Sequence, residues 1–411
     1  MGYFILPEGM YDTLDLFAEE LRAELVDLGH EVFVLPVDRL DESLPKLLRE
    51  HVRHGFDAVI AFNNLAWNLG SEEGRCLWEA MGTVYVDILM DHPFHFDRML
   101  SSLPEQTILF VIDQNHVDYV RRYYPQIKNV FFLPHAGCER AISALGRMDP
   151  VAERPIDVLY AGNLSRVLIE QLIPDFGQFP EIDGALFAQN ALERLIADPS
   201  QTTEQVIRDL LAERLGEGIP AGEEKRYITA FRFLDGFAVS FYREAAVRSL
   251  TQAGIFVHVL GLGWETCSWS DSPYLILDGK VTAPEVFPFM CRSKIVLNHL
   301  TWFKAGAHDR IFNGMLCGAA VVSDTSSYLE KELLPDSIRL YSQRDILRRP
   351  DLLPEMVNGL LSDDGERIAF SGRGQKEARE NHTFRRMAEQ ILTVLSGRGE
   401  KTASPDDDRH K

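Results

Sequence analysis

Lys304, His308 and Arg310 gather within one short stretch in the second half of the chain. The stretch follows an apolar run at residues 295–297, crosses a loop that contains Gly306, and continues into a short helical pattern. The free amides and the dipole of a helix N-terminus attract phosphate, and cationic side chains beside it strengthen that attraction. This spacing therefore predicts a site for an anionic ligand.

The elements around this stretch are those that would position it. Phe312, Met315 and Leu316 fall on one face of the helical pattern, and a glycine ends it. The run 319–322 indicates a buried strand, which ends just before Asp324. A strand end, a loop, a helix N-terminus and a second strand end are what a parallel α/β sheet offers a phosphate group.

Polar side chains also follow three apolar runs in the first half. Asp91 and His92 follow one run, Asp113 follows another, and His135 follows a third. Ligands of open α/β sheets bind outside the carboxyl ends of the strands, so these residues are expected to face a crevice. A metal site formed by His92, His95 and a carboxylate is a competing hypothesis, and structural histidines are another.

The run from His308 to Gly318, followed by a hydrophobic strand and Asp324, resembles the donor-binding motif of GT-B glycosyltransferases, and most closely that of the CgeB-like group. Most relatives carry a Glu near the start of this helix, where the present chain has Asn313. The substitution leaves open whether this position makes a charged contact with ribose or the donor sugar. The resemblance implies two Rossmann-like domains that face each other across a cleft.

The resemblance also implies residue roles. The candidates for binding the nucleotide sugar are Gly162, Asn163, Gly261, Trp264, Lys304, His308, Arg310, Asn313 and Asp324. Of these, Arg310 is the strongest candidate for the diphosphate, because a bidentate fork suits phosphate. An inverting enzyme would need a general base in the first domain, for which Asp91, His92 and His135 are candidates and Asp113 is a weaker one.

The resemblance implies no cofactor beyond the donor itself, which would be linked to UDP, GDP or dTDP. GT-B enzymes generally work without a metal. The metal-binding DxD motif of the other major glycosyltransferase fold matches only at residues 406–408, in a tail whose composition predicts disorder. The acceptor would be a glycan, a protein or a small molecule.

Alternating strand and helix patterns predict the α/β class with parallel sheets. The first domain is expected over 1–140 for the acceptor and the second over 155–375 for the donor, with a helical insertion at about 166–250. One helix at 376–396 should cross back to the first domain, and 397–411 should form a disordered tail.

The composition excludes several partners. The chain has 62 acidic residues against 42 basic ones, a formal charge of −20, which argues against nucleic acid or an anionic membrane. Apolar runs are too short for a membrane span. Five dispersed cysteines suit reduced thiols, so a cytoplasmic location is expected. The oligomeric state is left open.

Two other functions remain compatible with the sequence. One is a catalytically silent GT-B relative that binds a glycan or a protein as a scaffold, which Asn313 in place of Glu would suit. The other is a nucleotide-sugar epimerase on the same fold. The sequence does not choose between inversion and retention of the anomeric centre.

Overall fold

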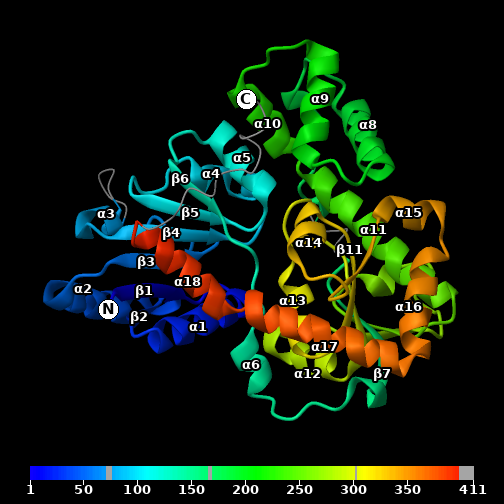
Figure 1. Ribbon diagram of the computed structural model, residues 1–411. Coiled ribbons are helices and arrows are strands. Elements are labelled where there is room, and N and C mark those ends of the chain that lie inside the picture. Colours follow the sequence, from blue (N-terminus) through cyan, green and yellow to red (C-terminus); the bar gives the residue numbers. More distant parts are fainter. Residues whose placement is uncertain (71–75, 165–168, 301–302, 398–411) are drawn as a thin grey trace, which may run out of the picture.

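The computed structural model describes residues 1–70, 76–164, 169–300 and 303–397, which form two α/β domains that lie side by side (Figure 1). Each domain is built on a six-stranded sheet in which paired strands run parallel. The predicted α/β class with two Rossmann-like domains is confirmed. Among the described helices, none has the length and apolarity to span a membrane.

The first sheet has the order β2-β1-β3-β4-β5-β6. Its strands are β1 (Tyr3–Glu8), β2 (Glu31–Pro36), β3 (Ala58–Phe62), β4 (Val84–Leu89), β5 (Thr107–Val111) and β6 (Asn129–Phe132). Its helices are α1 (Asp12–Asp27), α2 (Leu40–His54), α3 (Leu77–Met81), α4 (Asp97–Leu100) and α5 (Gln114–Tyr123). The strand order reverses between β1 and β3, where open sheets form a crevice.

The second sheet has the order β12-β11-β10-β7-β8-β9. Its strands are β7 (Ile156–Ala161), β8 (Val257–Leu260), β9 (Leu275–Gly279), β10 (Ser293–Asn298), β11 (Ala320–Asp324) and β12 (Arg339–Tyr341). Helices α12 (Ala283–Cys291), α13 (Asp309–Leu316), α14 (Ser327–Glu332), α15 (Gln343–Arg348) and α16 (Leu352–Ser362) accompany it. The sequence pattern missed β12, because a three-residue strand is too short to show a periodicity.

The chain between the two sheets contains α6 (Glu139–Ser143), and the helical insertion follows β7. The insertion comprises α8 (Gly184–Ala197), α9 (Thr203–Leu215), α10 (Ala221–Phe231) and α11 (Phe233–Gln252). Although it follows a strand of the second sheet, part of it packs on the first domain (Figure 1): Leu210 and Phe231 share a buried apolar cluster with Leu109 and Val120.

The C-terminal region differs from the expected single helix. It forms α17 (Asp364–Asn381) and α18 (Phe384–Leu395), separated at His382 and Thr383. One local and one distant contact accompany the break: the side chain of Thr383 accepts a hydrogen bond from the Arg386 amide and caps α18, and the His382 carbonyl accepts from the Gly137 amide. Helix α18 then lies against α1 of the first domain (Figure 1).

A loop between β10 and α13 also connects the domains. The Ala305 amide donates to Asp113 Oδ2 at 2.7 Å, and the Gln114 amide donates to the Ala305 carbonyl at 3.2 Å. On another side of the boundary, Asp12 Oδ2 accepts from the Ala283 amide at 2.8 Å. Helix α1 begins at Asp12, so the carboxylate of this residue bonds to the other domain and does not cap its own helix.

Candidate functional site

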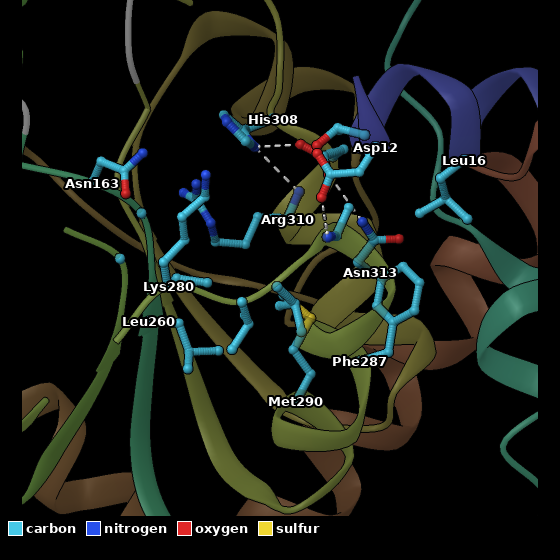
Figure 2. A pocket seen from close by; sticks show the side chains of 18 of the residues that line it. Asp12, Leu16, Asn163, Leu260, Lys280, Phe287, Met290, His308, Arg310 and Asn313 are labelled. Atoms are coloured by element: carbon cyan, nitrogen blue, oxygen red, sulfur yellow. Dashed lines mark hydrogen bonds and ion pairs between the residues drawn. The ribbon is translucent and has the colours of Figure 1, made fainter. Parts of the chain in front are cut away.

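A cleft of about 300 Å³ lies at the domain boundary. The first domain contributes the start of α1, and the second contributes the carboxyl ends of β7 and β8, the loop after β9, and parts of α12 and α13. In Figure 2, the polar side chains of Asn163, His308 and Arg310 gather at one end, while Phe287 and Met290 lie toward the other. The cleft therefore has a polar part and an apolar part.

Arg310 lies in the polar part and is only 8% exposed. Its Nη1 donates to Asn298 Oδ1 at 2.8 Å, and its guanidinium lies 5.5 Å from the centroid of the Tyr160 ring. Both partners are neutral, so they hold the side chain without cancelling its charge. Burial lowers the pKa of Arg310, and the charge of Arg243 adds to this effect. An arginine stays protonated in spite of such a shift, so the site offers a fixed positive charge.

Two glycine-containing loops form the adjacent wall. A Cβ added at Gly261, where φ is +145°, would lie 2.5 Å from the Gly162 carbonyl oxygen. A Cβ added at Gly162 would lie 3.4 Å from Arg310 Nη2. The loops therefore pack backbone against backbone beside the guanidinium, and Asn163 Oδ1 fixes them by accepting from the Leu262 amide at 2.9 Å. Such exposed backbone can approach a phosphate closely.

Two further cations were missed from the sequence. Lys280 follows β9 and lines the cleft. Arg243 on α11 donates from Nη1 to the Asn163 carbonyl at 2.8 Å, and its buried Nε has no hydrogen-bond partner among the described residues. The sequence could have indicated Lys280, because this residue directly follows Gly279 at the end of a strand. Nothing local signals Arg243, because it approaches the site from a helix 80 residues away from Asn163 along the chain.

His308, Asp309 and His135 form the junction between the domains. His308 caps α13, with Nδ1 accepting from the Arg310 amide at 3.2 Å, and the same atom lies 2.6 Å from Asp309 Oδ1. The ring of His135 stacks on that of His308, with centroids 6.0 Å apart. Burial lowers the pKa of His135 to about 4, which keeps it neutral. Burial alone would raise the pKa of Asp309, but His308, His135 and Arg310 hold it below its ordinary value.

Asn313 lines the cleft, yet its amide is already used by the protein. Its Nδ2 donates to Asp309 Oδ2 at 3.0 Å, and its Oδ1 accepts from the Cys138 amide at 2.8 Å. The residue thus ties α13 to the segment that joins the domains.

Three other predicted donor residues lie away from the cleft. The Trp264 side chain is fully buried and donates to the Gly162 carbonyl at 2.8 Å, so it supports the loop from behind. Lys304 lines a separate small cavity beside α11. Asp324 is fully buried, where it accepts from the Leu300 amide at 2.7 Å and from Gln343, and burial raises its pKa to about 7.

Among the predicted catalytic residues, Asp91 is not one of the side chains that line the cleft. Its Oδ2 accepts from Asn63 Nδ2 at 2.9 Å, and Asn63, with φ at 47°, also accepts from the Met90 amide. Burial raises the pKa of Asp91. Burial raises the pKa of the Tyr11 phenol, and the negative charges of Asp91 in the first domain and Asp309 in the second raise it further.

The other strand-end residues of the first domain serve internal contacts. His92 is 2% exposed and lies under α9, where Nε2 is 3.4 Å from Glu204 Oε2. Asp113 is fully buried and holds the interdomain loop and the start of α5. As for the competing metal hypothesis, the described part of the chain contains no cluster of three or more His, Cys, Asp or Glu side chains suited to a metal ion.

Residues 243–393 match a protein family described as glycosyl transferase-like. An α-glucosyltransferase in complex with UDP superimposes with a TM-score of 0.56 at 10% identity, over 96% of this chain and 99% of that chain. The same type of enzyme bound to UDP and a 13-mer DNA gives a TM-score of 0.57 at 11% identity, over 96% and 99%.

The chain has the GT-B fold. The matched region begins at Arg243 and extends through α13 into α18, so the region similar to this family contains the cations and most of the second-domain wall of the cleft. The predicted GT-B fold is confirmed. A sucrose-phosphate synthase from Thermosynechococcus elongatus also aligns over 97% of this chain and 99% of that chain, at 12% identity and a TM-score of 0.48. No curated protein sequence matches the chain.

Proposed function

We propose that this protein transfers a sugar from a nucleotide diphosphate sugar to an acceptor hydroxyl or another nucleophile. The observation that carries the proposal is the fixed guanidinium of Arg310, which lines the interdomain cleft beside the Gly162 loop and is held by the neutral side chains of Asn298 and Tyr160. A leaving diphosphate needs compensating charge, and a preorganised cation in a partly dry cleft supplies it.

The two ends of the cleft suit the two parts of such a donor. Arg310 and Lys280 would bind the diphosphate, the dipole of α13 would favour its negative charge, and Arg243 would add charge from behind the Asn163 loop. Phe287 and Met290 would pack against the nucleoside. These cations make charge compensation without a metal ion the proposed mechanism. Asp91 would accept the acceptor proton, because a base with a raised pKa is suited to that task.

Several finer assignments belong to the proposal. UDP is the first nucleotide to test, since the structural neighbours were solved with it. A neighbour was solved with DNA, but the net charge of −20 disfavours DNA here and favours a glycan, protein or small-molecule acceptor. We also propose the CgeB-like subtype, on the run from His308 to Gly318, and a cytoplasmic location, on five buried cysteines that form no disulfide.

The test is an activity assay with UDP-, GDP- and dTDP-linked sugars, which measures released nucleotide with and without a panel of acceptors. We expect turnover of at least one donor. Turnover of none, combined with no calorimetric heat on titration with the three nucleotide diphosphates, would overturn the proposal.

A scaffold is the second candidate, and one observation favours it. The side-chain amide of Asn313 donates to Asp309 and accepts from the Cys138 amide, so this position contributes no charge to a ribose. Nucleotide binding measured by calorimetry separates the candidates, because a scaffold with a decayed pocket gives no heat. An epimerase would instead convert the donor with no acceptor present.

A further inference from the structure

A second group of buried polar side chains lies where the insertion packs on the first domain. Glu204 of α9 is 7% exposed, and its Oε2 lies 3.4 Å from His92 Nε2. Neither atom makes a hydrogen bond within the described chain, and the same holds for the Tyr119 hydroxyl and both ring nitrogens of His116. Tyr119 is 3% exposed, and its ring meets that of His92 edge-on at 5.0 Å.

Packing two helices together does not require such a group. Each buried polar atom without a partner costs stability, and an apolar contact would be more stable. The surrounding interface is in fact apolar, since Val206, Leu210 and Phe231 fill it beside the polar group. Unpartnered polar atoms in an otherwise dry contact indicate a ligand that completes their hydrogen bonds.

A cavity of about 630 Å³ opens beside these residues, and Tyr119 and Glu204 line it. Arg208, whose buried Nε also lacks a partner among the described residues, and Gln201 line it as well. The wall thus offers a carboxylate that accepts, a guanidinium that donates, and amide and phenol groups that do both.

This mixture of groups suits hydroxyls better than charges. Each sugar hydroxyl can donate to Glu204 and accept from Arg208, whereas a phosphate or a polyanion would meet the carboxylates of Glu204 and Asp118 in the same wall. The rings of Tyr119 and Tyr123, whose centroids lie 4.7 Å apart, add apolar surface that could contact the C–H face of a pyranose.

The cavity continues toward the domain boundary. A second cavity, of about 490 Å³, shares Asn115 and Ser200 with it and is also lined by Lys304 and Ala305. Those two residues belong to the loop that leads to His308 at the edge of the donor cleft. Linked sugar units could therefore occupy the two adjoining cavities.

We propose that the cavity between α5 and α9 is a saccharide subsite that holds an extended acceptor, an assignment that rests on the proposed sugar transfer. Glu204 and Tyr119 supply its central hydrogen bonds. His92 lies behind Glu204 and positions it.

The experiment measures binding to an array of neutral oligosaccharides built from glucose, galactose, mannose and N-acetylglucosamine, with no donor present. We expect the wild-type protein to bind at least one series. The variants Glu204→Gln and Tyr119→Phe should each weaken that binding about tenfold or more, because the first replaces a charged acceptor with a neutral amide and the second loses a hydrogen bond in a buried site. The control Glu213→Gln, on an exposed part of α9, should bind as the wild type does.

The melting temperature of each variant separates the subsite from a structural role. If Glu204 serves the ligand, Glu204→Gln melts no lower than wild type while its glycan binding falls. A lowered melting temperature with unchanged glycan binding would assign the group to structure and overturn the inference, as would binding of no glycan on the array. Calorimetric titration with UDP is the independent check. The Kd for UDP should be unchanged in both variants. If the wild-type protein did not bind UDP, that result would count against the transferase proposal instead.

Discussion

The carboxyl ends of the two sheets carry similar polar residues but put them to different uses. In the first domain, His92 lies under α9, and Asp113 holds a loop from the other domain. In the second domain, Arg310 and the Gly162 loop line an open cleft. A polar residue at a strand end therefore identifies the functional edge of a sheet, but the segment that covers it decides whether a ligand can reach it.

What covers each edge follows from the side chains there. The first edge is crossed by the loop containing Ala305, whose amide donates to Asp113, and by the insertion, whose Glu204 lies beside His92. The second edge is bordered by Gly162 and Gly261, whose lack of side chains lets two loops pack tightly and leaves room in front of them. Asp91 and His135 are the other polar residues of the first edge, and the ring of His135 stacks on that of His308 in the second domain.

Substitution of Asp91 tests the difference between the two sheet edges most directly. Asp91→Asn should lower kcat about a hundredfold or more, because general-base catalysis contributes roughly 10²- to 10⁴-fold, while the Kd for donor stays unchanged. Burial raises the pKa of Asp91, so wild-type kcat should fall as pH drops through that raised value and the carboxylate gains its proton. Steady-state rates across pH check this. Equal kcat values for Asp91→Asn and the exposed control Asp41→Asn would show that the first edge is structural throughout.

Gly261→Ala tests the edge of the second sheet, which borders the open cleft. The new methyl group would collide with the Gly162 carbonyl and require a strained φ, so we expect a loss of about 3 kcal/mol in the free energy of unfolding, measured with urea. Gly279→Ala is the matched control: its φ is also positive, but a Cβ there meets nothing within 4 Å, so only about 1 kcal/mol should be lost. Equal losses would mean that the close packing of the loops is unimportant.

Asp113→Ala tests the edge of the first sheet, which the loop containing Ala305 and the insertion cover. The variant loses the cap of α5 and the bond to the Ala305 amide, which should cost about 2 kcal/mol of unfolding free energy. A loss below about 0.5 kcal/mol, the range of ordinary surface substitutions, would contradict the structural role.

The pH dependence of stability also tests the structural role of Asp113. Burial raises the folded-state pKa of Asp113 to about 6, above its ordinary value of 3.8. The folded protein therefore holds this proton more tightly than the unfolded chain, and stability should fall as pH rises from about 4 to 6. Asp113→Asn cannot ionise, so the urea midpoint of wild type relative to this variant should fall over that range. A constant difference would place the pKa of Asp113 near its ordinary value.

The smallest effect is expected away from both edges. Thr383→Ala removes the cap of α18, the helix that crosses to the first domain, at a cost of about 1 kcal/mol. Donor affinity should not change, because the cap lies outside the cleft. A loss of donor affinity in calorimetry would mean that the docking of α18 shapes the cleft.

Much of the fold could be predicted because parallel strands buried on both faces are apolar runs, as at residues 58–62 and 295–297. The helix after His308 was predictable from its own periodicity. The break at His382 was not, because the bond from the Gly137 amide that accompanies it comes from a distant segment.

The site could be predicted only where its residues are close in sequence. The spacing of His308 and Arg310 placed both in one pocket, and both line it. Arg243 and the contact between Asn313 and Cys138 depend on chain segments that meet only in the folded protein. Trp264 illustrates the opposite error: an aromatic residue in a glycine loop suggests stacking on a ligand, but its N–H is needed by the Gly162 carbonyl.

The central claim is that Arg310 holds the diphosphate of the donor. Calorimetric titration of UDP into wild type, Arg310→Ala and the exposed control Arg349→Ala tests it most directly. We expect Arg310→Ala to raise the Kd about tenfold to a hundredfold, which corresponds to the loss of charge-assisted hydrogen bonds, and Arg349→Ala to leave it unchanged. Binding of UDP by Arg310→Ala with the wild-type Kd would contradict the account.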